Sequence, residues 1–171
     1  RLQVMGHKDA LKVKYIFGPY KGTSIYFEAI KSYLRSNGVK GLEEVAKIKY
    51  RDGEWPGYLR IDLKNGRILR SPKFYYNYLI PFFITKESLI SVDFTNELTD
   101  LSVGDAWSPK YENQAGGFSV VLARSEKALI LAKEMENKGL LALEPVTHDE
   151  VLQMHAHMID FKKRGSFIRI K

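Results

Sequence analysis

The densest group of acidic side chains in this basic chain lies between Asp93 and Asp105, with Glu97 and Asp100 between them. Carboxylates at such short intervals can bind a divalent cation, although the central glycine and terminal glutamate of an EF-hand loop are absent. The same aspartates could instead accept hydrogen bonds from nearby backbone amides in a network of turns. From the sequence, both interpretations stay open.

The histidines are the next candidates for metal chemistry. His148, His155 and His157 fall on one expected helix, but their spacings of seven and two residues do not give the i,i+4 pair that a zinc-binding helix requires. We therefore interpret them as partly buried or surface histidines. The chain also lacks a serine–histidine–acid order and a glycine-flanked nucleophilic serine, so the sequence gives no support for hydrolase chemistry.

An unusual turn at residues 52–57 holds Trp55 between the flexible Gly53 and the rigid Pro56. A large indole fixed in this way could stack on a planar ligand. It could equally form a lid over the hydrophobic core. The turn is thus a candidate binding element with a structural alternative.

The composition limits the classes of protein to which the chain can belong. With 171 residues, it is expected to form a single domain over residues 1–171, with residues 1–10 as a candidate end of a truncated N-terminal region. The absence of cysteine excludes disulfides, thiolate nucleophiles and iron–sulfur ligation. A net charge of +7 favours anionic partners such as phosphate-bearing cofactors, while nucleic acid is unlikely because no nucleic-acid-binding signature is present. We expect a cytoplasmic protein without a membrane segment.

The first half of the chain predicts a strand, a helix and a β-meander. Residues 11–17 alternate apolar side chains with lysines, as strands do. Thr23 or Ser24 can cap a helix that ends at Asn37-Gly38. Period-two alternation then predicts strands at residues 48–50, 58–63 and 67–69, and Asn65-Gly66 between two of these runs is a strong hairpin signal.

The second half predicts further helices around a buried strand. The aromatic segment 74–83 is interpreted as a short helix that ends near Pro81 and packs into the core, although flat rings also suit a flavin site. Residues 93–107 are expected to be a loop, and residues 118–123 a strand buried on both faces. Ser125 and the capping box of Thr147 with Glu150 begin two more helices. Their expected apolar faces are Ala128, Leu129, Leu131, Ala132 and Met135 in the first, and Val151, Met154, His155, Met158 and Ile159 in the second. The predicted fold class is α+β (α/β-like), with a mixed β-sheet, a β-meander and at least three flanking helices.

Three consecutive blocks, at residues 51–60, 93–107 and 116–121, resemble the beta subunit family of coenzyme F-420 hydrogenases and dehydrogenases, in its C-terminal domain. The resemblance implies a flavin-dependent oxidoreductase that transfers a hydride between FAD and the deazaflavin coenzyme F-420. It also implies partners, either other redox subunits or a second copy in a homo-oligomer. On this resemblance we expect the cofactor-binding residues to be Gly53, Trp55, Pro56, Gly57, Thr95, Gly104, Asp105 and Trp107.

One departure from the family pattern concerns its iron–sulfur cluster. The resemblance places a Cys-x-x-Cys pair at positions that hold Ser88 and Ser91 in this chain. Serine hydroxyls do not deprotonate readily enough to replace thiolates on iron. We therefore expect no iron–sulfur cluster. The alternative function is a non-catalytic interaction or scaffold domain that kept the fold after losing the redox centre.

Overall fold

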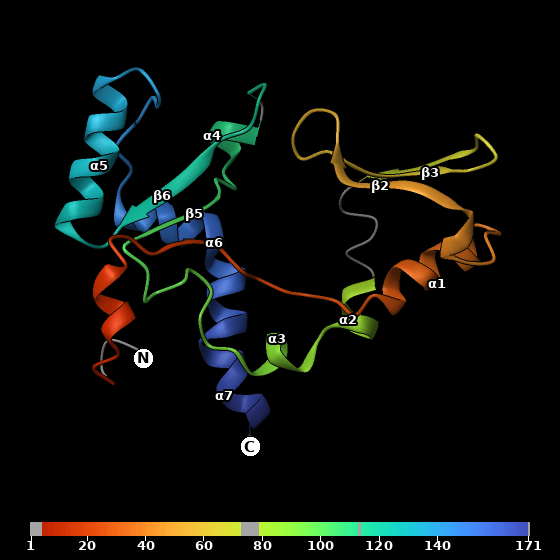
Figure 1. Cartoon of the computed structure of the whole chain (residues 1–171). Coiled ribbons are helices and arrows are strands. Elements are labelled where there is room, and N and C mark those ends of the chain that lie inside the picture. Colours follow the sequence, from red (N-terminus) through yellow and green to blue (C-terminus); the bar gives the residue numbers. More distant parts are fainter. Residues whose placement is uncertain (1–4, 73–78, 113, 171) are drawn as a thin grey trace.

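The computed structural model describes residues 5–72, 79–112 and 114–170. These residues form two separate three-stranded sheets, one of strands β2, β3 and β4 and the other of β1, β5 and β6. Helices join the sheets and cover them, as Figure 1 shows, with α1 beneath the first sheet and α6 beneath the second. This arrangement confirms the predicted α+β class with a β-meander.

The meander consists of β2 (Val45–Asp52), β3 (Tyr58–Leu63) and β4 (Ile68–Pro72), paired antiparallel in that order. The predicted turns lie where the sequence placed them, and Gly66 in the second turn has a positive φ of 86°, which glycine adopts without strain. β2 starts three residues earlier than predicted, at Val45. The period-two pattern was therefore a sound guide to this sheet.

The main hydrophobic core lies between the meander and the helix α1 (Glu28–Ser36). Side chains from alternate positions of β3 meet one face of α1, and a short 3₁₀ helix, η2 (Leu42–Glu44), leads from α1 into β2. The buried members of this core are Ile30, Tyr33, Leu34, Val39, Leu59, Ile61, Leu63 and Leu69.

The helix α1 begins later than predicted. Its N-cap is Phe27, not Thr23 or Ser24. Ser24 lies in an extended segment, where its amide donates to Ser88 Oγ (2.8 Å) and its carbonyl accepts from the Thr85 amide (2.9 Å). These long-range hydrogen bonds hold the backbone outside the helix.

The second sheet has the order β1-β5-β6, with β1 (Phe17–Pro19) parallel and β6 (Ser119–Ala123) antiparallel to β5 (Leu101–Asp105). The prediction of a loop over residues 93–107 was wrong, because β5 lies inside it. The apolar pattern of β5 is interrupted in the sequence by Ser102, a polar residue at a fully buried position. Its hydroxyl accepts a hydrogen bond from Arg124 (2.7 Å). β6 confirms the predicted strand, but of its residues only Val120 is buried, so the expectation of burial on both faces was wrong.

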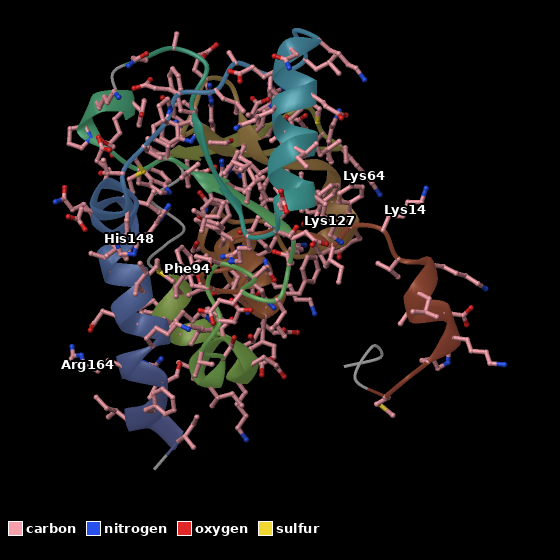
Figure 2. The ribbon with its side chains drawn as sticks, turned by 90° about the vertical axis from the view of Figure 1, so that its left-hand side faces the viewer. Lys14, Lys64, Phe94, Lys127, His148 and Arg164 are labelled. Atoms are coloured by element: carbon pink, nitrogen blue, oxygen red, sulfur yellow. The ribbon has the colours of Figure 1, made fainter. Side chains whose placement is uncertain are left out.

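The N-terminal segment differs most from its prediction. Residues 11–17 do not form a strand: Lys8–Lys12 form the 3₁₀ helix η1, and β1 starts only at Phe17. The side chain of His7 caps η1 by accepting from the Asp9 amide, and Lys12 pairs with Asp9 at 2.6 Å. Figure 2 shows η1 projecting away from the rest of the molecule, and among the described residues strand pairing begins only where Phe17 meets Leu101.

Six further helices follow the meander in the described residues: α2 (Ile80–Phe83), α3 (Lys86–Ile90), α4 (Pro109–Glu112), α5 (Glu126–Asn137), α6 (His148–Lys162) and α7 (Arg164–Ile170). Pro81 stands in the first turn of α2, not at its end; Phe74, Tyr75, Tyr76 and Tyr78, which the aromatic prediction included, lie outside the described residues. The capping box of Thr147 and Glu150 at α6 is confirmed.

The apolar faces of the last long helices were predicted unequally well. α6 buries Met154 and His155 as expected. α5 buries only the two alanines of its predicted face, and Leu129 is 46% exposed, because only one side of this outlying helix meets the sheet (Figure 1). Among the described residues, no helix is long and apolar enough to cross a membrane.

Candidate functional site

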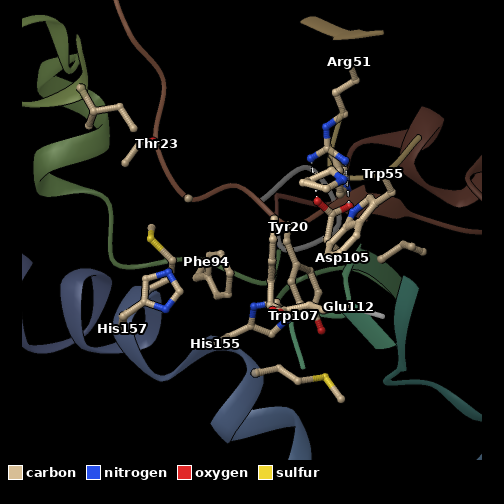
Figure 3. Close-up of a pocket in the computed structure, with 18 of the residues that line it drawn as sticks. Tyr20, Thr23, Arg51, Trp55, Phe94, Asp105, Trp107, Glu112, His155 and His157 are labelled. Carbon is tan, nitrogen blue, oxygen red and sulfur yellow. Dashed lines mark hydrogen bonds and ion pairs between the residues drawn. The ribbon is translucent and has the colours of Figure 1, made fainter. Parts of the chain in front are cut away.

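A cavity of about 1180 Å³ lies where the carboxyl ends of β1 and β5 face the β2–β3 turn, with α6 along a third side. Because β1 and β5 are parallel, the residues that follow them reach the same edge of the sheet. We call this space the central cavity (Figure 3). Its walls are formed by Pro19, Tyr20, Gly22, Thr23, Ile25, Arg51, Trp55, Pro56, Ile80, Phe94, Val103, Gly104, Asp105, Trp107, Glu112, Met154, His155, His157 and Met158.

Tyr20 stands directly at the end of β1. Its amide donates to the carbonyl of Val103 (2.8 Å), which extends the pairing with β5 by one residue. The ring lies so close to Gly104 that a Cβ there would be 2.2 Å from Tyr20 Cδ2. Gly104 therefore makes room for the tyrosine ring. The expected close approach to Gly104 occurs, but from a side chain of the same protein.

Trp55 reaches across from the β2–β3 turn and meets Trp107, with ring centroids 4.6 Å apart and planes inclined by 44°. The peptide bond between Trp55 and Pro56 is cis. On another side, a Cβ on Gly117 would lie 2.8 Å from Trp55 Cγ, so this glycine backbone packs on the indole. The half-buried Trp55 thus forms part of the cavity wall and joins the meander to the second sheet.

An ion pair at the cavity wall also joins the two sheets. Arg51, near the end of β2, donates to both carboxylate oxygens of Asp105, at the end of β5, over 2.6 and 3.2 Å (Figure 3). The side chains are 47% and 25% exposed, so solvent weakens the attraction. Paired arginine and carboxylate groups nevertheless fix orientation. The carboxylate of Asp105 is therefore directed toward Arg51.

The helix α6 contributes an imidazole to the centre of the wall. His155 is 3% exposed, and its ring lies 5.2 Å from that of Tyr20 and 5.3 Å from that of Phe94. Burial, and secondarily the charge of His157, lower the pKa of His155 below its usual value of 6.5. Burial also raises the pKa of Tyr20 to about 12. At neutral pH both side chains are uncharged, and each has a proton to donate.

Three polar atoms on this wall have no hydrogen-bond partner in the described part of the chain. They are Tyr20 Oη, Trp55 Nε1 and His155 Nε2, and each is inaccessible to water. A buried donor or acceptor without a partner costs about 1–3 kcal/mol, so folded proteins contain few of them. All three belong to residues that line the central cavity. This concentration marks the cavity as the candidate binding site.

The structure brings together five of the eight residues that the sequence suggested for the site: Trp55, Pro56, Gly104, Asp105 and Trp107. The other three lie outside the cavity wall. Gly53 and Gly57 have positive φ values of 85° and 83°, and they shape the turn that carries Trp55. Thr95 accepts from Arg124 through both its hydroxyl and its carbonyl.

Sequence reasoning missed Tyr20, Phe94 and Arg51, and it treated His155 only as part of an apolar helix face. Tyr20 follows an unremarkable Gly-Pro pair, and nothing local shows that it will meet β5. The apolar surroundings of His155 in α6 were a usable signal, since a histidine on a buried face needs a polar partner. Its neighbours could not be identified without the tertiary arrangement.

The carboxylates of the acidic group are all engaged by other groups of the protein. Asp93 accepts from the Glu97 amide through both carboxylate oxygens (3.1 Å each). Asp100 accepts from the Ser125 hydroxyl and the Ile16 amide. The Ser125 hydroxyl, Lys127 and the Ile16 amide, in that order, lower the pKa of this carboxyl. Within the described residues, no group of three or more histidine, aspartate or glutamate side chains is placed to hold a metal ion. The turn-network interpretation therefore fits Asp93, whereas Asp100 and Asp105 are held by groups distant in the sequence.

The segment where the family resemblance placed cluster ligands is occupied by the protein's own hydrogen bonds. Ser88 is 1% exposed; its hydroxyl accepts from the Ser24 amide, and its carbonyl accepts from Lys162 Nζ at 2.9 Å. Lys162 is itself 1% exposed, and burial lowers its pKa. Ser166 donates to the carbonyl of Ser91 (3.0 Å). With no cysteine in the chain, this segment does not fit an iron–sulfur cluster.

Comparisons with known proteins agree with the resemblance. A family model that describes the C terminus of the coenzyme F-420 hydrogenase/dehydrogenase beta subunit matches residues 1–149. Among solved structures, the chain is similar to a chain of the F-420-reducing NiFe hydrogenase complex from Methanosarcina barkeri, with 16% identity and a TM-score of 0.62. The alignment covers 98% of this chain and 55% of that one, so this chain spans about half the length of its neighbour. The comparison with curated proteins gives no match.

Proposed function

Because the chain belongs to the coenzyme F-420 hydrogenase/dehydrogenase beta subunit family, we propose that its central cavity binds the ring of a flavin or deazaflavin, FAD or coenzyme F-420. The observation that carries this proposal is that three buried polar atoms without a partner in the described part of the chain all belong to residues of this cavity wall. A ring bearing carbonyl and N–H groups would supply the missing partners once small side-chain shifts on binding bring these buried atoms into contact with it. The protein would then act as a flavin-dependent oxidoreductase module.

The size and lining of the cavity suit such a ring. Its volume of about 1180 Å³ is slightly larger than the roughly 300–1000 Å³ of typical small-molecule sites, so a three-ring system has room. Trp55, Trp107, Tyr20 and Phe94 supply aromatic surface for a planar ligand. When bound, the cofactor would supply hydride-transfer chemistry, whereas the protein positions the ring and tunes its surroundings. These residues would hold the ring and exclude water from it.

The charges on the wall favour a ring over a phosphate group. Arg51 is engaged by Asp105, and Glu112 adds a negative charge. An anionic tail would be repelled by this lining, so we place the phosphates outside the cavity, on the surface of a chain with a net charge of +7. The proposed cavity ligand is therefore the ring itself.

The function is proposed without an iron–sulfur cluster in this chain. Hydride exchange between two organic cofactors does not itself require iron. Electron exchange with other redox subunits, or assembly with a second copy, is part of the proposal, supported by the similarity to a chain of a hydrogenase complex. A single domain over residues 1–171 and a cytoplasmic location also stay predictions.

The two tryptophans of the chain give a direct test, because both line the cavity. Titration with FAD or coenzyme F-420 should quench intrinsic tryptophan fluorescence to saturation, whereas ADP, which lacks the ring, should not. Trp107→Leu should weaken binding when the cofactor's own absorbance is followed. Tyr50→Leu, at a 48% exposed position of β2 outside the cavity wall, should bind as the unmodified protein does.

The same titration distinguishes the alternative function. If neither cofactor gives saturable quenching or a change in absorbance, the redox proposal fails, and the non-catalytic scaffold becomes the better explanation of the fold. Equal quenching by ADP would also contradict the proposal, because the response would then not depend on the ring.

A further inference from the structure

The ring of Tyr20 is tightly packed, but its hydroxyl has no hydrogen-bond partner in the described part of the chain. Its ring packs between Phe94 and His155, with centroids 5.2 Å from each, and against the backbone of Gly104. These contacts define the position of the ring in the ligand-free protein. Its hydroxyl is nevertheless buried and has no hydrogen-bond partner among the residues that the structure describes. Packing alone would be served equally well by phenylalanine.

His155 shows the same combination on the facing helix. The side chain is 3% exposed, its neighbours Tyr20 and Phe94 are aromatic, and Nε2 has no partner in the described part of the chain. A neutral imidazole offers one donor and one acceptor, and a phenol offers both. Together, the two side chains match a ligand edge that carries a carbonyl oxygen beside a ring N–H.

We propose that Tyr20 and His155 form the hydrogen-bonding edge of the central cavity, and that they recognise the pyrimidinedione edge shared by flavins and deazaflavins. This inference rests on the proposed function and adds two recognition residues that the sequence did not suggest. It also has a thermodynamic consequence. Polar groups kept for a ligand lower the stability of the ligand-free fold, since they lose water and gain nothing until the ligand binds.

The structure offers a matched comparison within the same chain. Tyr33 lies in the main core, and its hydroxyl is hydrogen-bonded to the hydroxyl of Ser71. Tyr33→Phe removes a satisfied group and should lower the melting temperature. Tyr20→Phe removes an unsatisfied one and should raise it. Because the unpartnered hydroxyl alone would produce this rise, the loss of ligand binding in Tyr20→Phe is the measurement that distinguishes recognition from packing.

The test combines melting curves of the ligand-free protein with binding of lumiflavin, an uncharged ring probe. We expect Tyr20→Phe to melt about 2 °C or more above the unmodified protein and to bind lumiflavin about 5- to 10-fold more weakly, the loss typical of one hydrogen bond. His155→Phe should weaken binding similarly, and His155→Gln, which keeps polar atoms at this place, should restore part of it. Tyr33→Phe should bind like the unmodified protein.

Parallel titrations with FAD and coenzyme F-420 identify which of the two rings binds at this edge. Tyr20→Phe should weaken the binding of that cofactor by the same factor as the binding of lumiflavin. If Tyr20→Phe melts lower, or binds as tightly as the unmodified protein, the recognition edge is overturned while the proposed function stands. If the unmodified protein binds none of the three ring compounds, both are overturned.

Discussion

The meander with α1 and the second sheet with α6 differ in how completely their side chains are packed. In the first region, Leu59 and Ile61 are fully buried within a core of eight residues, and Tyr33 shares a hydrogen bond with Ser71. In the second region, the buried cluster is smaller and borders a large cavity. Over the described ranges of the chain, the buried side-chain nitrogen and oxygen atoms without a hydrogen-bond partner belong to residues of that cavity wall. The first region is therefore the more completely packed of the two, and the second contains the cavity for which binding is proposed.

The charged groups follow the same division. On the meander, Asp52 pairs with Lys49 and Arg60, and Arg60 also pairs with Asp62, so these ion pairs lie within one sheet. The pair of Arg51 with Asp105 instead links the meander to the second sheet, at the cavity. Ion pairs within a sheet support the pairing of neighbouring strands, whereas the pair of Arg51 with Asp105 connects the two sheets at the cavity. The two regions thus meet at the place where binding is proposed.

The largest effect is expected from Leu59→Ala in the main core. A fully buried leucine cut to alanine costs about 2–5 kcal/mol of unfolding free energy, which urea denaturation would measure. Ile68→Ala, at a 51% exposed position of the same sheet, is the matched control and should cost less than about 1 kcal/mol. Equal losses would contradict the assignment of the stabilising core to this side of the meander.

Gly104→Ala should destabilise the second region, because Gly104 is in close contact with the ring of Tyr20. The new methyl group would meet the Tyr20 ring, and such overpacking costs about 1–3 kcal/mol. Displacement of the ring should also weaken flavin binding. Tyr20→Ala in the same chain should relieve the clash, so a double-mutant cycle would show a favourable coupling; strictly additive effects would exclude the contact.

Tyr33→Phe tests the difference between the two regions with the loss of a single hydroxyl group. Loss of its hydroxyl removes a buried hydrogen bond and leaves Ser71 without this partner, which should cost about 1–2 kcal/mol. Thermal or urea unfolding would give the value. Since Tyr20→Phe is expected to act in the opposite direction, changes of the same sign in both variants would remove the thermodynamic distinction between the two regions.

The smallest expected effect concerns pH. Burial holds the pKa of His155 below 6.5 in the folded state, so below about pH 6.5 the unfolded chain binds a proton more readily than the folded chain. Stability from the neutral imidazole is fully present above pH 6.5, and it falls as the pH drops toward the lower folded value. His155→Phe should flatten this slope in urea titrations. His148→Gln, which removes an exposed imidazole, should keep it.

Much of the fold was accessible to sequence reasoning because its signals are local. Alternating side chains and Asn65-Gly66 specified the meander, and Thr147 with Glu150 specified the start of α6. Predictions from local signals were wrong where a residue forms hydrogen bonds with groups distant in the sequence. Ser24 is held by Ser88 and not in a helix, and β5 was hidden because the buried Ser102 is satisfied by Arg124.

By itself, the sequence determined the α+β class, the family, the absence of thiolate ligands and the turn that carries Trp55. These properties depend on residue types and short spacings. Only the tertiary structure decided that Tyr20 and His155 meet, that Gly104 makes room for Tyr20, and that Arg51 pairs with Asp105. The parallel pairing of β1 with β5 and the placement of α6 bring these distant residues together, and no short-range pattern encodes contacts of that kind.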